Sequence, residues 1–229
     1  MNLSIRLKAV SDTVLKCETA ADIGCDHGYV SIDLADRKIA SRIIACDVNK
    51  GPLEAAKENI ALHNLENVIE TRLSNGLDKI KESDYVNAII IAGMGGALMT
   101  RILEEGKEIV SFADQLILQP QSELFLVRKW LRDNGYNIDS EKMVKDAGKY
   151  YFIMDARKGE NKEYEPALQK IYDNYSEYLI KNKNAILKEY LQKGLENNTG
   201  YMAGIAPDRQ KELQDKTELI KSALALMEA

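Results

Sequence analysis

Apolar runs alternate with helical patterns over residues 3–158, and this alternation constrains the fold of the 229-residue chain more than any other feature. Strands separated by crossover helices form a parallel sheet with helices on both faces. The runs at 87–91 and 115–118 are apolar on both faces, as central parallel strands must be. The expected strands are residues 19–23, 42–47, 68–73, 86–92 and 116–119, and the expected helices are residues 29–38, 51–63, 96–109 and 122–134.

The two ends of this region carry other patterns. Residues 3–16 have apolar side chains at helical spacing, which predicts a short amphipathic helix before the first strand. Residues 136–144 and 150–155 follow one another without a helix between them, so we expect a terminal antiparallel hairpin. The predicted fold class is therefore α/β, with a Rossmann-like, mostly parallel sheet whose final hairpin is antiparallel.

A different repeat begins near residue 161. Side chains recur there at alternating spacings of three and four, which is a heptad stripe, at Leu168, Ile171, Tyr175, Tyr178, Asn182 and Ala185. A loop with Gly194, Gly200 and Gly204 is expected to interrupt this helix, and a second helix to begin near Pro207. We predict that residues 1–158 form the Rossmann-like domain and that residues 159–229 form a two-helix coiled-coil hairpin.

Composition excludes several classes of protein. The three cysteines are an odd set with no Cys-x-x-Cys spacing, which predicts neither a disulfide framework nor a metal site. No apolar run approaches the ~18 residues that span a bilayer, and the first residues lack a signal-peptide core, so we expect a cytoplasmic protein without membrane contact. We also expect a monomer. The net charge of −5 means that any RNA surface must be a local patch.

The segment at 22–29 reads Asp-Ile-Gly-Cys-Asp-His-Gly-Tyr and lies between a predicted strand and a predicted helix. Such turns at the carboxyl edge of a parallel sheet bind ligands. Gly24 and Gly28 would let a ligand approach the backbone, because neither has a Cβ. Asp26 stands at the middle glycine of the dinucleotide fingerprint, where a carboxylate would repel a pyrophosphate. It would instead favour the ammonium and sulfonium charges of S-adenosylmethionine.

Polar residues also follow the next two strands. Asp47 ends the second strand, where a carboxylate can accept hydrogen bonds from both ribose hydroxyls of a nucleoside. Such a contact would serve a nicotinamide dinucleotide and S-adenosylmethionine equally. Asn75 and Gly76 follow the third strand and offer an amide and a tight turn where an adenine edge could be read.

The fourth and fifth strands end in small and amide residues. The segment at 92–96, Ala-Gly-Met-Gly-Gly, either frees the place where a flat substrate would meet the cofactor or is a flexible loop. The segment Gln119-Pro120-Gln121 either presents its amides to a base edge or is a strand that the proline ends.

In this order, the motifs resemble the bacterial TrmK family. They are the segment at 22–29, Asp47, Ser-Asn-Gly-Leu at 74–77, Ala-Gly-Met-Gly-Gly at 92–96 and Leu-Gln-Pro-Gln at 118–121, and the likeness spans nearly the whole chain. The resemblance implies a class I methyltransferase that transfers a methyl group from S-adenosylmethionine to N1 of adenosine 22 in tRNA. It implies a cofactor site made of Asp22, Gly24, Cys25, Asp26, Gly28, Asp47, Val48, Asn75, Gly76, Ala92 and Gly93.

The resemblance also implies which residues lie near the acceptor base. Asp26 and Tyr29 are expected as catalytic residues, and the expected substrate-binding residues of the two strand ends are Met94, Gly95, Gly96, Gln119, Pro120 and Gln121. The segment at 92–95 replaces the Asn/Asp-Pro-Pro-Tyr/Phe box typical of exocyclic amine methylation. This departure agrees with attack by a ring nitrogen.

Attack by adenine N1 builds positive charge on the base, which a nearby carboxylate could stabilise. Asp26 is the candidate, and the alternative is that it holds the cofactor's ammonium group or the loop itself. Position 22 lies in the folded core of tRNA, so we expect the base to be turned out of its stack. Phosphate contacts would offset that cost, and their candidates, unless they are ordinary surface charges, are Arg6, Lys8, Arg128, Lys129, Arg132, Lys181, Lys183 and Lys188.

Other functions stay open. The acceptor could be another RNA, a protein or a small molecule, because the cofactor motifs do not select it. A non-catalytic RNA-binding scaffold is a second alternative, which binding of S-adenosylmethionine would separate from an enzyme. A nicotinamide dehydrogenase is disfavoured by Asp26 and by the absent third glycine of the fingerprint.

Overall fold

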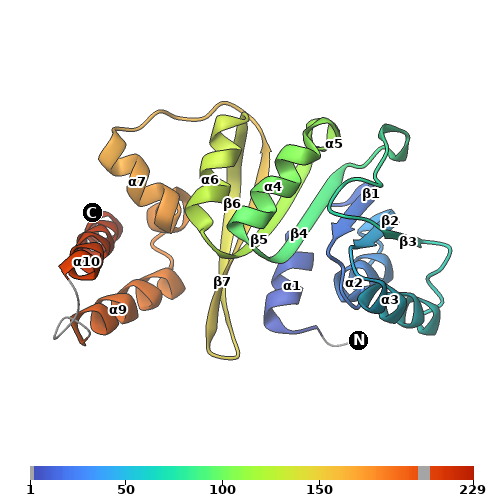
Figure 1. The fold of residues 1–229 in the computed structure, drawn as a ribbon, viewed down its shortest axis with the longest axis horizontal. Coiled ribbons are helices and arrows are strands. Elements are labelled where there is room, and N and C mark those ends of the chain that lie inside the picture. Colours follow the sequence, from blue (N-terminus) through green and yellow to red (C-terminus); the bar gives the residue numbers. More distant parts are fainter. Residues whose placement is uncertain (1–2, 201–206) are drawn as a thin grey trace. The chain divides into compact units, whose positions relative to one another are not determined.

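The chain forms two compact units, residues 1–161 and residues 162–229 (Figure 1). The computed structural model describes residues 3–200 and 207–229. Each unit has its own set of buried apolar side chains.

A seven-stranded sheet in the order β3-β2-β1-β4-β5-β7-β6 forms the first unit. Its strands are β1 Cys17–Ile23, β2 Ala40–Asp47, β3 Ile69–Leu73, β4 Ala88–Gly95, β5 Gln115–Ser122, β6 Tyr136–Asp146 and β7 Lys149–Lys158. The first five strands pair in parallel, and β7 pairs antiparallel with both β5 and β6. The predicted Rossmann-like sheet and its final hairpin are confirmed. The strand order reverses between β1 and β4, where open α/β sheets bind their ligands.

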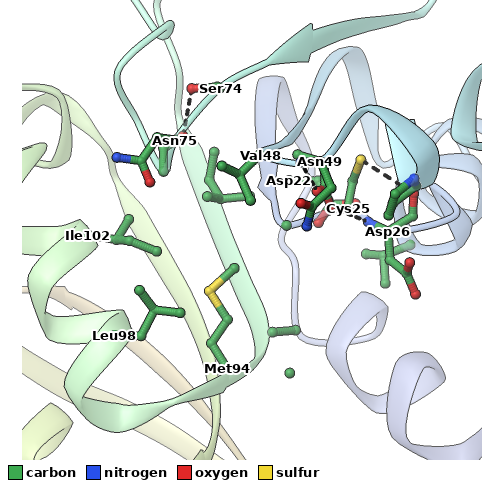
Figure 2. Close-up of a pocket in the computed structure, with 18 of the residues that line it drawn as sticks. Asp22, Cys25, Asp26, Val48, Asn49, Ser74, Asn75, Met94, Leu98 and Ile102 are labelled. Atoms are coloured by element: carbon green, nitrogen blue, oxygen red, sulfur yellow. Dashed lines mark hydrogen bonds between the residues drawn. The ribbon is translucent and has the colours of Figure 1, made fainter. Parts of the chain in front are cut away.

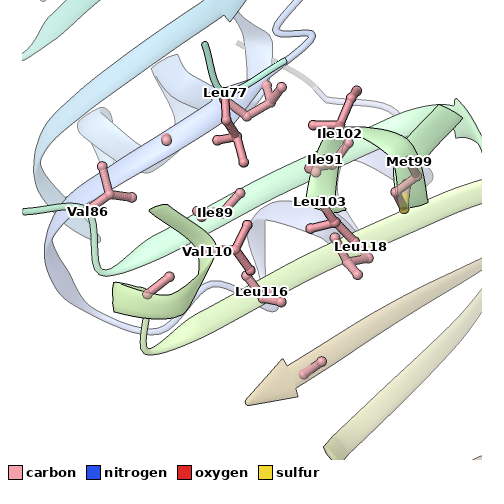
Figure 3. Packing of buried hydrophobic residues seen from close by; sticks show 14 of the residues in the cluster. Leu77, Val86, Ile89, Ile91, Met99, Ile102, Leu103, Val110, Leu116 and Leu118 are labelled. Carbon is pink, nitrogen blue, oxygen red and sulfur yellow. The ribbon is translucent and has the colours of Figure 1, made fainter. Parts of the chain in front are cut away.

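Helices cover both faces of this sheet, because the strands are apolar on both faces. One face packs against α1 Ile5–Ser11, α2 Tyr29–Asp36 and α3 Lys50–Leu62. The other face packs against α4 Gly96–Glu105, α5 Lys107–Phe112 and α6 Leu124–Asp133. Figure 3 shows the second layer, in which Met99, Leu103 and Val110 pack on Ile89, Ile91 and their neighbours in β5.

The predicted helix at 96–109 is two helices, α4 and α5, which are separated at Gly106. The chain runs close to Leu77 at this point, and a Cβ on Gly106 would lie 2.4 Å from the Leu77 Cδ1 atom. Glycine is also a poor residue for a helix interior. Close packing against the loop after β3 therefore accounts for the break.

The second unit differs from the predicted two-helix hairpin. It has four helices, α7 Pro166–Tyr175, α8 Glu177–Lys181, α9 Ala185–Gly200 and α10 Pro207–Glu228, among its described residues. Helix α10 begins where a helix was expected, but the heptad stripe at 168–185 is broken twice. Gly194 and Gly200 lie inside α9 instead of in a loop, and Gly204 falls outside the described residues.

Side-chain caps explain both breaks. The buried Ser176 has a φ of 72°, and its hydroxyl oxygen accepts a hydrogen bond from the Leu179 N–H at 3.1 Å, which starts α8. The carboxamide oxygen of Asn184 accepts the N–H groups of Ile186 and Leu187 at 3.0 Å and starts α9. Such side chains compete with the helical ladder for backbone N–H groups. Spacing alone therefore predicted a longer helix than the chain forms.

Gly96 is a position where the fold requires the absence of a side chain. Its Cβ would lie 2.4 Å from the Glu123 carbonyl oxygen, and backbone cannot move aside cheaply. We expect Gly96→Ala to lower the free energy of unfolding by about 1–3 kcal/mol, the usual cost of overpacking, as measured by urea unfolding. The matched control is Gly51→Ala in α3, where nothing lies within 4 Å of the added Cβ. That variant should be at least as stable as the native chain, and equal losses in the two variants would contradict the close contact at Gly96.

Candidate active site

A pocket of about 660 Å³ opens at the carboxyl ends of β1 to β4. Figure 2 shows Asp22, Cys25 and Asp26 along one side and Asn75, Leu98 and Ile102 along the other, with Val48 and Met94 between them. The segments after four successive strands of the sheet thus meet around one cavity. The predicted cofactor residues that line it are Asp22, Gly24, Cys25, Asp26, Asp47, Val48, Asn75, Gly76, Ala92 and Gly93.

The turn after β1 depends on three positive φ angles, 75° at Gly24, 52° at Asp26 and 73° at Gly28. A Cβ on Gly24 would lie 2.3 Å from the Met94 Cε atom, so the Met94 side chain lies directly over this bare position. Gly28 is not among the residues that line the pocket. A Cβ there would lie 3.3 Å from the Ala56 Cβ, so Gly28 permits close packing of α2 on α3. Its predicted contact with the cofactor stays a prediction.

Two buried carboxylates lie in this pocket. Asp22 accepts a hydrogen bond from the Ser31 hydroxyl at 2.6 Å. Asp47 accepts the Asn49 N–H at 2.8 Å through one oxygen and the Asp26 N–H at 3.2 Å through the other. Burial raises the pKa of Asp22 from 3.8 to about 6, and repulsion by Asp47 adds to the rise, against the opposing effect of Ser31.

The carboxylates of Asp22 and Asp47 favour a bound cation and would repel a pyrophosphate. An ammonium group beside Asp22 would offset the cost of burying its charge. Each Asp47 oxygen keeps a lone pair for a hydroxyl donor, because a carboxylate has about four acceptor positions. Burial raises the pKa of the Cys25 thiol far above its ordinary value, so this pocket residue is a neutral thiol, unsuited to nucleophilic chemistry.

Asp26 and Tyr29 lie at the mouth of the pocket. The Asp26 side chain is 69% exposed, and its carboxylate lies 3.7 Å from the His27 Nε2 atom. The ring of Tyr29 is partly exposed and stacks on His27, with ring centroids 5.4 Å apart. The backbone N–H of Asp26 is hydrogen-bonded to the buried Asp47 carboxylate, whereas the Asp26 side chain is turned toward solvent.

The part of the pocket next to Gly93 is called the slot, because Gly93 has no side chain to fill it. Gly93 has a φ of 84°. From the position of a Cβ on Gly93, the Arg6 Nη1 atom would be 3.5 Å away and the Gln121 Nε2 atom 3.7 Å away. The same Nη1 atom donates a hydrogen bond to the Gln119 Oε1 at 2.8 Å, and the guanidinium lies over the Tyr151 ring. Met94 and Gln121, which are expected to bind the substrate, line the pocket.

Several predicted substrate residues do not reach the pocket. Gln119 is fully buried behind Arg6, and Pro120 is buried with it. Gly95 and Gly96 face Ser122 and Glu123 at the start of α6.

Among the residues expected to contact RNA, Arg128 is the one that the structure places in the interior. It is 5% exposed, and it forms a buried ion pair with Glu141 at 2.6 Å. Its guanidinium also lies over the Phe152 ring. A buried cation that holds a carboxylate is not available to a phosphate, so the prediction for Arg128 is wrong. The other candidates are at least partly exposed, and the lysines of this group that pair with acids are Lys8, Lys129, Lys181 and Lys188.

Motif reasoning missed part of the pocket wall. Arg6 was considered only as a phosphate contact, yet its side chain borders the slot. Leu98, Arg101 and Ile102 contribute one face of α4. Their spacing of three and four residues is a signal that could have placed them on the side of α4 that faces the pocket.

Within residues 3–200 and 207–229, no group of three or more His, Cys, Asp or Glu side chains is placed to hold a metal ion. In the same part of the chain, every helix is too short or too polar to cross a membrane.

Comparison with known proteins gives a consistent result. Residues 3–154 match a family model described as a methyltransferase domain. The chain is 33% identical to the tRNA (adenine(22)-N(1))-methyltransferase of Bacillus subtilis (strain 168) over 240 residues, which cover 98% of each protein.

Solved structures agree over the same length. The B. subtilis M1A22 tRNA methyltransferase TrmK superposes with a TM-score of 0.84 at 30% identity, over 97% of this chain and 98% of that one. The M. capricolum TrmK in complex with S-adenosyl-homocysteine superposes with a TM-score of 0.87 at 25% identity, over 98% and 99% of the two chains. The resemblance predicted from the motifs is confirmed, and the chain belongs to the bacterial TrmK family of tRNA (adenine(22)-N(1))-methyltransferases.

Proposed function

We propose that this chain transfers the methyl group of S-adenosylmethionine to N1 of adenosine 22 in tRNA, as a monomer in the cytoplasm. The observation that carries the proposal is the pair of buried carboxylates, Asp22 and Asp47, in a pocket that also contains the bare Gly93 slot. Family membership supports the same reaction, because the curated B. subtilis relative carries that activity in its name.

The pocket residues suggest how the cofactor is held. Asp22 would pair with the ammonium group, since its buried carboxylate accepts hydrogen bonds from the hydroxyl and the backbone of Ser31 but has no cationic partner among the described residues. Asp47 would accept the ribose hydroxyls through its remaining lone pairs. Asn75, with Leu98 and Ile102 beside it, would hold the adenine ring in the wall that Figure 2 shows opposite Asp22 and Asp26.

The cofactor supplies an electrophilic methyl group next to a sulfonium. The lone pair of adenine N1 forms the new N–C bond while the C–S bond breaks and its electron pair stays on sulfur, so the positive charge moves to the base. No proton has to leave for this step to balance. The enzyme's part is to align N1 with the methyl group, which can supply roughly 7–11 kcal/mol, and to stabilise the new charge.

Asp26 and Tyr29 are placed at the mouth, where the acceptor base would enter. The Asp26 carboxylate would stabilise positive charge on the base, since it is exposed at the mouth of the pocket while the backbone N–H of the same residue is held by Asp47. Tyr29 and His27 would give the base a flat aromatic surface. Lys129 and Arg132 on α6 stay proposed contacts for the phosphate backbone.

The direct test is an assay with labelled S-adenosylmethionine and unmodified tRNA that carries adenosine or guanosine at position 22. We expect label in the adenosine tRNA alone, as N1-methyladenosine at that position after nucleoside mapping. Label elsewhere in the RNA would point to another acceptor. Cofactor binding without any transfer would favour the RNA-binding scaffold.

The Asp22 carboxylate is expected to lower the free energy of unfolding of the free protein and to raise its affinity for S-adenosylmethionine. Its pKa is raised in the fold, so the free energy of unfolding should fall as pH rises from about 4 to about 6. Asp22→Asn should remove this dependence and stabilise the free protein above that range by up to about 3 kcal/mol, while weakening binding of S-adenosylmethionine by ~10-fold or more.

Urea unfolding as a function of pH and calorimetric titration measure the two effects of Asp22→Asn. Glu66→Gln on the surface is the control, and it should change neither quantity. A variant that binds the cofactor as well as the native chain would contradict the role of Asp22.

Asp26→Asn tests the charge at the mouth of the pocket. We expect kcat/KM for tRNA to fall by ~10-fold, the value of about 1.4 kcal/mol in the transition state, with an unchanged affinity for S-adenosylmethionine. Asp36→Asn, at the far end of α2, is the matched control and should keep native activity. A native rate for Asp26→Asn would exclude the charge-stabilising role, and a loss of cofactor affinity would assign Asp26 to the ammonium group.

A further inference from the structure

Two glutamines at the end of β5 have different environments. Gln119 is fully buried, its Oε1 accepts a hydrogen bond from Arg6, and its Nε2 donates to the Pro120 carbonyl at 3.3 Å. Gln121 is exposed and lines the pocket. Within the described part of the chain, its amide nitrogen and oxygen have no hydrogen-bond partner. Gln121 therefore presents both a donor and an acceptor to whatever enters the slot.

The pairing of β4 with β5 places this amide at the slot. Ala92 pairs with Gln119, Met94 with Pro120, and Gly95 with Ser122. Gly93 on one strand and Gln121 on the other are the two residues that this register skips. Such bulges turn a side chain out of the regular ladder and are frequent beside active sites. The Gln121 Nε2 atom accordingly lies 3.7 Å from the position of a Cβ on Gly93.

A carboxamide matches one edge of adenine. Beside the Watson–Crick edge, adenine presents the N7 acceptor and an N6–H donor, and glutamine can bond to both at once. Guanine presents two acceptors on the same edge, N7 and O6, and does not match a carboxamide. Contact through N6 and N7 leaves the N1 lone pair free.

We propose that Gln121 reads the N6 and N7 edge of the acceptor adenine and thereby turns N1 toward the methyl group. The inference rests on the proposed function and adds the residue that selects the base. Arg6 cannot take this role, because a guanidinium has no acceptor for N6–H. Gln119 cannot take it either, because its acceptor is occupied and its side chain is buried.

The test combines one change in the protein with one change in the base. The two substrates are tRNA with adenosine and tRNA with 7-deazaadenosine at position 22. 7-Deazaadenosine lacks the N7 acceptor and keeps N1 and N6. For the native chain we expect kcat/KM to fall by about 5- to 100-fold on the 7-deaza substrate, the usual range for a lost base contact. Gln121→Ala should show a similar loss on adenosine and no further loss on 7-deazaadenosine.

Two controls separate readout from general damage. Ser122→Ala changes the next residue, whose hydroxyl faces Gly95, and it should keep the full sensitivity to N7. A tRNA with 3-deazaadenosine changes the opposite side of the base, and the effects of this change and of Gln121→Ala should add. Calorimetric titration with S-adenosylmethionine should give the native affinity for Gln121→Ala, because none of the proposed cofactor contacts is altered.

The outcomes separate the inference from the function on which it rests. Equal rates of the native chain on adenosine and 7-deazaadenosine tRNA would overturn the readout and leave the methyltransferase reaction standing. Additive losses from Gln121→Ala and the 7-deaza substitution would also overturn it, because partners in one contact cannot be lost twice. No transfer to the adenosine tRNA would overturn the proposed function and the readout together.

Discussion

The carboxylate of Asp47 holds the pocket together. Its two oxygens accept one N–H from the turn after β1 and one from its own turn after β2, at Asp26 and Asn49. The N–H groups of Gly24 and Cys25 also bond to the Cys46 carbonyl, immediately before it. The left-handed turn after β1 is thus fixed to the neighbouring strand by backbone donors. The positions of Gly24 and Asp26 at the cavity follow from this attachment, whereas Asp22 is placed by the pairing of β1 with β2 and β4.

The pocket also brings two negatively charged side chains close together. Asp22 and Asp47 are both buried in one pocket, and burial disfavours the ionised form of Asp22. A fold under selection for stability alone would place a neutral side chain there. The arrangement suits a site that is completed by a cation, which the proposed cofactor supplies. The Met94 side chain lies over Gly24 in the same pocket. A methionine side chain is flexible, so it can move aside when a ligand binds.

The sequence predicted the sheet and brought most of the residues that line the pocket together for one reason. Strands that are apolar on both faces must lie parallel in the interior, and the carboxyl ends of parallel strands meet at one edge, which brings Asp22, Asp47, Asn75 and Gly93 together. Contacts between distant residues were not predictable in this way. Nothing near Arg128 in the sequence indicates Glu141 as its buried partner. Likewise, the heptad stripe gave no sign that the Ser176 and Asn184 side chains would cap new helices.

The two bulges beside the slot cancel each other. Gly93 is one extra residue on β4 and Gln121 is one extra residue on β5, so Gly95 and Ser122 meet with the same offset as Ala92 and Gln119. Beyond them, α4 and α6 begin side by side, and the Ala97 N–H reaches the Glu123 carboxylate. A deletion in one strand alone would therefore shift one helix against the other. Removal of both residues together would keep Gly95 opposite Ser122, so the alignment of the two helices depends on the equal lengths of the two strand ends and not on either bulge alone.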